Sequence, residues 1–147
     1  MIWVYILFAF LAGVLIPAQS GINSQLARWL GHPVLAALVS FVVGAFVLSV
    51  YALFLRSSWP TLASLAGAPW WVWTGGFFGA FFITVAAAYA PKLGAATFIS
   101  VALAGQMLAS LALDHFGLVG FEVRHVTPWR FVGALLVIIG VVLVRRF

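Results

Sequence analysis

The chain lacks cysteine and has very little charge. Only 6% of its 147 residues are charged, just two are acidic, and 66% are hydrophobic. Soluble domains carry about 25% charged residues, so the nine ionised side chains present (seven basic, two acidic) cannot cover a soluble protein of this size. Without cysteine there is no disulfide framework, thiolate nucleophile or cysteine metal site. This composition predicts an integral membrane protein.

Patterns typical of enzymes, metal sites and nucleic-acid-binding proteins are also missing. The sequence has no HExxH, phosphate-binding loop or GxSxG motif, and its three histidines, at positions 32, 115 and 125, lack metal-ligand spacing. The net charge is +5, but the seven basic residues are scattered and form no stripe that could follow phosphates. We therefore expect no enzymatic activity, no metal or other cofactor, and no nucleic-acid partner.

Five apolar segments are candidates to cross a hydrocarbon core of about 30 Å at 1.5 Å rise per residue. The fifth is short, because only fourteen uncharged residues lie between Arg130 and Arg145, about 21 Å, and it spans the core only if both arginines reach outward along their stems. We expect an all-α integral membrane protein, a five-transmembrane-helix bundle that forms a single transmembrane domain over residues 1–147. Pro91 and Gly94 predict a tight turn between the third and fourth helices. The expected helices cover approximately residues 2–30, 33–55, 70–90, 94–114 and 129–146.

The first segment has two other interpretations. Residues 2–16 could belong to a signal peptide cleaved near Ala18–Ser20, although no basic residue precedes the apolar stretch. Residues 19–32 could form a solvated loop instead of helix. A continuous helix would be about 44 Å long and kinked at Pro17, whose nitrogen has no proton for a helical hydrogen bond.

The distribution of basic residues does not clearly predict how the chain is oriented in the membrane. Five spans place three of them on the side of the N-terminus and four on the opposite side. An excess of Lys and Arg normally faces the cytoplasm, so this balance allows the chain to insert both ways and pair antiparallel with itself. The alternative is that one or two arginines near the ends impose a single orientation. The two sets are Arg56, Arg124 and Arg130 against Arg28, Lys92, Arg145 and Arg146.

A continuous first helix would align polar side chains in one stripe. At 100° per residue, Tyr5, Gln19 and Asn23 fall on the same face. Broken transmembrane helices are tolerated where they line a cavity, and transporters use them to bind solutes. These three residues are therefore candidates for binding a polar solute.

The fourth segment carries a second polar stripe. Gln106, Ser110 and Asp114 follow one another at i, i+4 spacing and share a face. Polar groups in lipid are costly, so Gln106 and Ser110 are candidate solute-binding residues and Asp114 is a candidate for proton coupling. The alternative is structural: Gln106 and Ser110 would join helices, and Asp114 would pair with His115, Arg124 or Arg130.

Small residues recur at helical spacing. Gly75 and Gly79 in the third segment, and Gly133 and Gly140 in the fifth, place glycines on helix faces where two backbones can approach closely. This pattern predicts helix packing within a bundle or dimer, and no specific chemistry follows from it.

Several of these features occur together in a known pattern. One block of this pattern runs from Pro17 to Gly44. A second block runs from Gly105 to Gly117 and reads GQMLASLALDHFG. The pattern also includes Gly75, Gly76, Gly79, the Pro91–Gly94 turn, Arg130 and Gly133. Together they resemble, almost from end to end, the small YdcZ-type inner-membrane proteins of the drug/metabolite transporter superfamily. The resemblance implies a multi-pass, five-helix half-transporter in the cytoplasmic (inner) membrane, similar to one half of the ten-helix, inverted-repeat members.

The resemblance also implies secondary-active transport of a small metabolite or drug-like solute. Alternating access normally needs two inverted repeats, which a five-helix chain can gain as an antiparallel homodimer or with a paralogous partner. The four-helix multidrug exporters of the superfamily carry a glutamate in the first helix, whereas this first helix has no acid and leaves Asp114 as the proton-coupling candidate. The alternative function is a non-transporting accessory or assembly subunit of a larger membrane complex.

Overall fold

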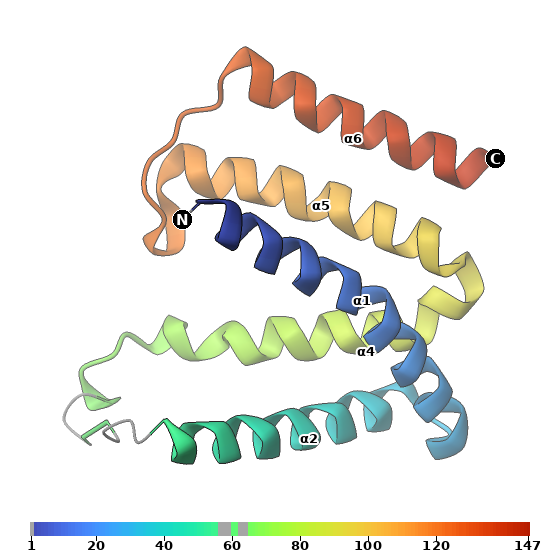
Figure 1. The fold of residues 1–147 in the computed structure, drawn as a ribbon, viewed down its shortest axis with the longest axis vertical. Helices are drawn as coiled ribbons and strands as arrows, with labels where there is room; N and C mark the ends of the chain where they lie inside the picture. The colour runs from blue at the N-terminus through green and yellow to red at the C-terminus, as the bar shows by residue number, and fades with distance from the viewer. Residues whose placement is uncertain (1, 56–59, 62–64) are drawn as a thin grey trace. The chain divides into compact units, whose positions relative to one another are not determined.

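The computed structural model describes residues 2–55, 60–61 and 65–147, and the regular elements of these residues are helices (Figure 1). Five of the described segments are long and apolar enough to cross a membrane. This confirms the predicted all-α, five-helix membrane fold. Arg56, which entered the comparison of basic residues, lies outside the described residues.

The first helix, α1 (Ile2–Leu30), is continuous over 29 residues. It runs past Pro17 without a break, and the segment 19–30 is helical rather than a loop (Figure 1). A proline removes one backbone hydrogen bond, whereas an unwound segment in lipid would leave many polar groups unpaired, so continuing the helix costs less.

A very short connection leads from α1 to α2 (Pro33–Phe54). Gly31 has a φ of +78°, a conformation that glycine adopts without a steric penalty, and it ends α1. His32 then caps α2, because its Nδ1 accepts a hydrogen bond from the backbone N–H of Val34 at 3.2 Å. Pro33 occupies the first helical position, where its missing N–H has no helical partner to lose.

The third span consists of the 3₁₀ helix η1 (Trp70–Thr74) followed by α4 (Gly75–Leu93). It extends three residues beyond the expected end at residue 90, with Pro91 inside the helix. Pro91 lacks a backbone N–H and gives up one helical hydrogen bond, yet α4 continues for two more residues, to Leu93. Gly94, with a φ of +83°, separates α4 from α5 (Ala95–Phe116).

The fifth span is α6 (Pro128–Arg146), which begins after a loop containing the 3₁₀ helix η2 (Leu118–Gly120). The side-chain oxygen of Thr127 caps α6 by accepting a hydrogen bond from the Arg130 N–H at 3.3 Å. The helix spans 19 residues, which is about 28 Å and matches the thickness of a bilayer core.

The chain divides into two compact units, Met1–Pro91 and Lys92–Phe147, which we call the N-terminal and C-terminal units. In the N-terminal unit, Ala27, Ala36 and Ala87 form the buried core, each from a different helix. Alanines let helix backbones approach closely.

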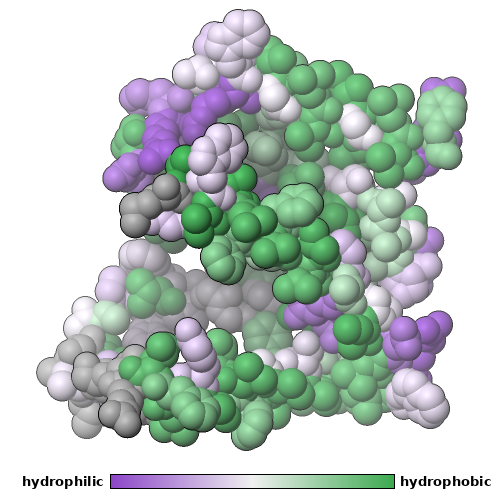
Figure 2. Space-filling model, in the orientation of Figure 1, coloured by the Kyte–Doolittle hydropathy of each residue, from purple (hydrophilic) through white to green (hydrophobic). Residues whose placement is uncertain are grey.

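Larger apolar side chains point outward, so most of the molecular surface drawn in Figure 2 is hydrophobic. An extensive exposed apolar surface is expected of a protein whose solvent is lipid.

Candidate functional site

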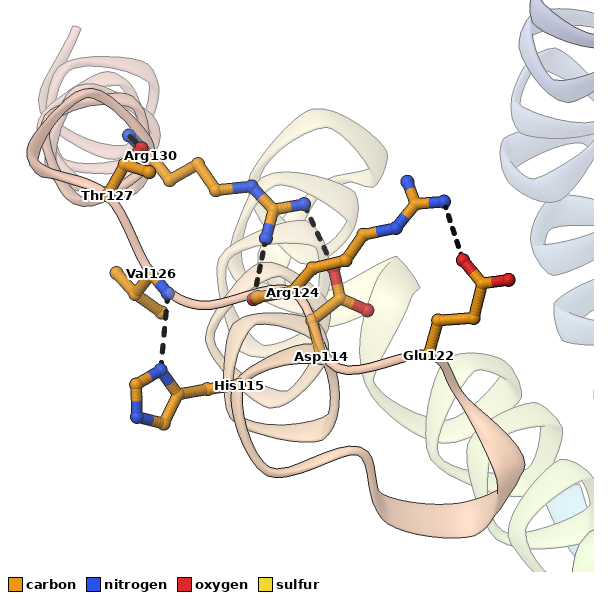
Figure 3. A network of polar contacts seen from close by, with 7 residues as sticks. All are labelled: Asp114, His115, Glu122, Arg124, Val126, Thr127 and Arg130. Atoms are coloured by element: carbon orange, nitrogen blue, oxygen red, sulfur yellow. Dashed lines mark hydrogen bonds and ion pairs between the residues drawn. The ribbon is translucent and has the colours of Figure 1, made fainter.

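Four charged side chains of the C-terminal unit lie together near the end of α5: Asp114, Glu122, Arg124 and Arg130 (Figure 3). The Arg130 Nη2 donates to the Asp114 Oδ2 at 3.0 Å, and its Nη1 donates to the carbonyl oxygen of Arg124 at 3.1 Å. The backbone N–H of Arg124 donates in turn to the carbonyl oxygen of Asp114 at 2.8 Å. With 36% of the Arg130 side chain and 25% of the Asp114 side chain exposed, this ion pair is partly shielded from solvent. It ties the start of α6 to the end of α5.

A tight turn and a side-chain hydrogen bond shape the loop that Arg130 closes. Gly117 ends α5 in the left-handed conformation, with a φ of +61°. A Cβ placed there would lie 2.6 Å from the Cγ2 of Val123, so only glycine fits this position. Further along, the Nδ1 of His115 accepts a hydrogen bond from the Val126 N–H at 3.2 Å. This bond places the proton of a neutral His115 on its Nε2.

Among the three partners predicted for Asp114, the structure pairs it with Arg130. The guanidinium group of Arg124 instead pairs with Glu122 at 3.3 Å, in an exposed position (Figure 3). His115 packs edge-on against His125, with ring centroids 5.3 Å apart. The proton-coupling role of Asp114 stays a prediction.

A hollow of about 310 Å³ lies beside this ion pair, between α5 and α6. Ser110 and Asp114, two of the predicted site residues, both line it, together with Gly133. Gln106 is exposed and does not line this hollow. The complete lining is Met107, Ser110, Leu111, Asp114, Arg130, Gly133 and Ala134.

The N-terminal unit contains a hollow of about 270 Å³ among α1, α2 and α4. Gln19 lines it, as a solute-binding candidate should, whereas Ser40 and Phe41 were not among the predicted site residues. The sequence signal for Ser40 is a hydroxyl four residues before Gly44, in an apolar span whose other hydroxyl groups belong to Ser49 and Tyr51. The lining consists of Gln19, Ser40, Phe41, Gly44, Ala45, Leu48 and Ile83.

Two polar side chains near Gln19 are buried, those of Ser20 and Asn23, which are 4% and 3% exposed. The hydroxyl of Ser20 has no hydrogen-bond partner among the described residues. Tyr5, at the other end of the predicted stripe, is exposed. A buried polar group without a hydrogen bond costs about 1–3 kcal/mol, so the Ser20 hydroxyl requires an explanation.

The glycines predicted to pack helices differ in their surroundings. A Cβ at Gly79 would lie 3.1 Å from the Cζ of Phe41, so the Phe41 ring of α2 reaches the backbone of α4 at this point. At Gly75, Gly133 and Gly140 a Cβ would meet no atom within 4 Å. Packing through these three glycines stays a prediction. As for metal binding, no three His, Asp or Glu side chains come together to hold an ion in residues 2–55, 60–61 and 65–147.

Five apolar spans define a multi-pass membrane protein, and a few polar side chains line hollows between its helices. A family model described as "Putative inner membrane exporter, YdcZ" matches residues 4–143. The chain belongs to this YdcZ family, as the resemblance predicted, and is a multi-pass protein of the inner membrane. The family description indicates a transporter role rather than an enzymatic one.

One curated relative supports the assignment. The chain is 29% identical to the inner membrane protein YdcZ of Escherichia coli strain K12 over 140 residues, which cover 95% of this chain and 93% of that protein. No solved structure matches the chain.

Proposed function

We propose that the protein is a secondary-active transporter that moves a small metabolite or drug-like solute across the inner membrane by alternating access. The observation that carries this proposal is the buried hydroxyl of Ser20 on α1, which has no hydrogen-bond partner among the described residues; the side chain of Asn23, three residues further along α1, is also buried. Helices that only pack together could replace both with alanine and avoid the cost of burying them. A polar solute that visits the site would supply the missing hydrogen bond.

The proposed solute-binding residues occur in both units. Tyr5, Gln19 and Asn23 belong to the N-terminal unit, and Gln106 and Ser110 belong to the C-terminal unit. Gln19 and Ser110 each line a hollow, which supports their assignment. All five side chains are neutral hydrogen-bonding groups, so a neutral solute fits them better than an ion.

Alternating access requires an inverted copy of the five-helix unit, and we assign this role to a second copy of the chain in an antiparallel homodimer. The nearly equal numbers of basic residues on the two sides, three and four, support insertion in both orientations. A paralogue of opposite orientation is the alternative partner.

Asp114 is the proposed site of proton coupling. Its carboxylate holds Arg130 at 3.0 Å. Protonation would remove the charge that binds the guanidinium group, and the end of α5 could then separate from the start of α6. Asp114 also lines the hollow that Ser110 lines. Protonation of Asp114 and binding of a solute beside Ser110 could therefore both change this hollow.

The test of this function is transport by the chain with Gln19, Asn23 and Gln106 replaced by leucine. The variant should lose at least about nine-tenths of the flux of radiolabelled neutral solutes into proteoliposomes, because leucine cannot replace the lost hydrogen bonds to the solute. Gln25→Leu, an exposed position of α1 that lines no described hollow, is the matched control and should transport normally. Unchanged flux in the triple variant would remove these residues from the site.

A non-transporting accessory subunit is the second candidate function. The open surroundings of Gly75, Gly133 and Gly140 favour it, since such faces can accept helices of a larger partner. Purification in mild detergent separates the two candidates: a transporter forms a dimer by itself, whereas an accessory subunit purifies as a monomer or together with its partner.

A further inference from the structure

The serines of the membrane helices fall into two groups. Three of them donate the hydroxyl proton to the carbonyl oxygen four residues earlier, at 2.7–2.8 Å: Ser24, Ser49 and Ser100. This bond satisfies a hydroxyl group inside an apolar helix. Ser40 makes no such bond among the described residues, although it lies in the same helix as Ser49. Its hydroxyl is therefore available to a ligand.

Ser40 lines the 270 Å³ hollow of the N-terminal unit together with the amide of Gln19. These two side chains are the only ones in the lining with hydrogen-bonding groups, and the remaining side chains are apolar, including the ring of Phe41. The hollow therefore combines a small polar region with an apolar wall. Pockets for drug-sized ligands measure about 300–1,000 Å³, so this hollow is the size for a compact solute.

The charge of the N-terminal unit restricts the solute further. Residues 1–91 contain no Asp or Glu, so no carboxylate is available to compensate a cation. The basic residues of this segment are Arg28 and Arg56. Arg28 does not line the hollow, and Arg56 lies outside the described residues. A charged group moved from water into an apolar site without a partner is strongly disfavoured.

We propose that the hollow among α1, α2 and α4 binds a neutral solute that has a planar apolar body and one amide-like hydrogen-bonding group. Gln19 and Ser40 contact the polar group, and Phe41 contacts the planar body. This inference rests on the proposed transport function and specifies the class of solute.

Gly79 positions the ring that shapes this hollow. Its absent side chain leaves room for Phe41, because a Cβ there would come within 3.1 Å of the ring. An alanine at this position forces either the ring or the spacing of α2 and α4 to change, and both changes alter the hollow. Gly79 is thus a positioning residue that acts through Phe41.

The first experiment compares three probes of nearly the same size and different charge. Binding of radiolabelled benzamide, benzylamine and benzoate is measured at pH 7 on the full chain in lipid nanodiscs, with empty nanodiscs as background. Benzamide should bind at least about tenfold more tightly than either charged probe, because only the charged probes must be buried without a counter-charge. Equal affinities for all three, or no binding of benzamide, would overturn the proposal.

Matched variants locate the site. Ser40→Ala should weaken benzamide binding about threefold to tenfold, the effect of losing one neutral hydrogen bond. Ser49→Ala should leave it unchanged, since the Ser49 hydroxyl already bonds the Ala45 carbonyl. Gly79→Ala should weaken binding at least about twofold, and Gly76→Ala, where a Cβ would meet no atom within 4 Å, should not. An equal effect of both serine variants would overturn the assignment of Ser40.

Flux measurements separate this inference from the function on which it rests. Benzamide binding that depends on Ser40, in a chain that moves no solute into proteoliposomes, supports the site and contradicts the transporter function. Transport that is unaffected by Ser40→Ala and Gly79→Ala supports the transporter function and contradicts this site.

Discussion

At the scale of single residues, Arg130 links the two helices of the C-terminal unit. It lies in the first turn of α6, where the helix dipole disfavours a positive charge. The carboxylate of Asp114 and the carbonyl oxygen of Arg124 both accept hydrogen bonds from its guanidinium group and offset that cost. The sequence offers three possible partners for Asp114: His115, Arg124 and Arg130. Which of them pairs with Asp114 depends on the turn at Gly117, and the spacing of charges along the sequence does not predict that turn.

Replacing the two arginines of this network should have unequal effects. Arg130→Ala should lower the free energy of unfolding by about 1–2 kcal/mol, because it leaves the partly shielded Asp114 unpaired. Arg124→Ala should lower it by less than about 0.5 kcal/mol, since its pair with Glu122 is exposed and its backbone bonds remain. Detergent-induced unfolding in mixed micelles measures both values, and equal losses would contradict a special role for Arg130.

At the scale of helices, the second half of α1 forms the core of the N-terminal unit. The buried residues of this helix all follow Pro17, and they include Ala27, which packs in one cluster with Ala36 of α2. The hydropathy of the sequence predicted the spans themselves well. It placed the end of the third helix too early, because α4 continues past Pro91 and the positive φ of Gly94 ends it.

The alanine core predicts a position that cannot accept a larger side chain. Ala36 is 0% exposed, so Ala36→Leu should separate α1 from α2 and lower the free energy of unfolding by about 1–3 kcal/mol. The control is Ala109→Leu, at an exposed position of α5, which should change stability by less than about 0.5 kcal/mol. Both values come from detergent-induced unfolding, and similar effects would show that the α1–α2 contact is loosely packed.

At the scale of the whole molecule, the proposed antiparallel homodimer depends on the weak charge bias of the chain. Five crossings of the membrane would put three basic residues on the side of the N-terminus and four on the other, and the pair at the end of α6 would make this difference. The cytoplasmic side normally holds the excess of Lys and Arg, so small changes in this pair should shift the orientation of the chain.

Topology reporters at the C-terminus test this proposal directly. Fusions active only in the cytoplasm and only outside it should give comparable signals on the unmodified chain. Replacing Arg145 and Arg146 with serine leaves three basic residues against two, so the C-terminus should move outside and the external reporter should gain signal. A signal from one side only on the unmodified chain would exclude pairing with an inverted copy of itself.

Hydropathy and short motifs in the sequence were sufficient to predict the membrane class, the number of spans and the family. These properties follow from hydropathy summed over about twenty residues and from short local patterns, which do not depend on neighbouring helices. The tertiary structure decided which polar side chains have partners. Ser40 and Ser49 look alike in the sequence, yet one lines a hollow and the other bonds its own helix. Partner choice depends on atoms within about 3 Å, often from distant segments, so hydropathy cannot predict it.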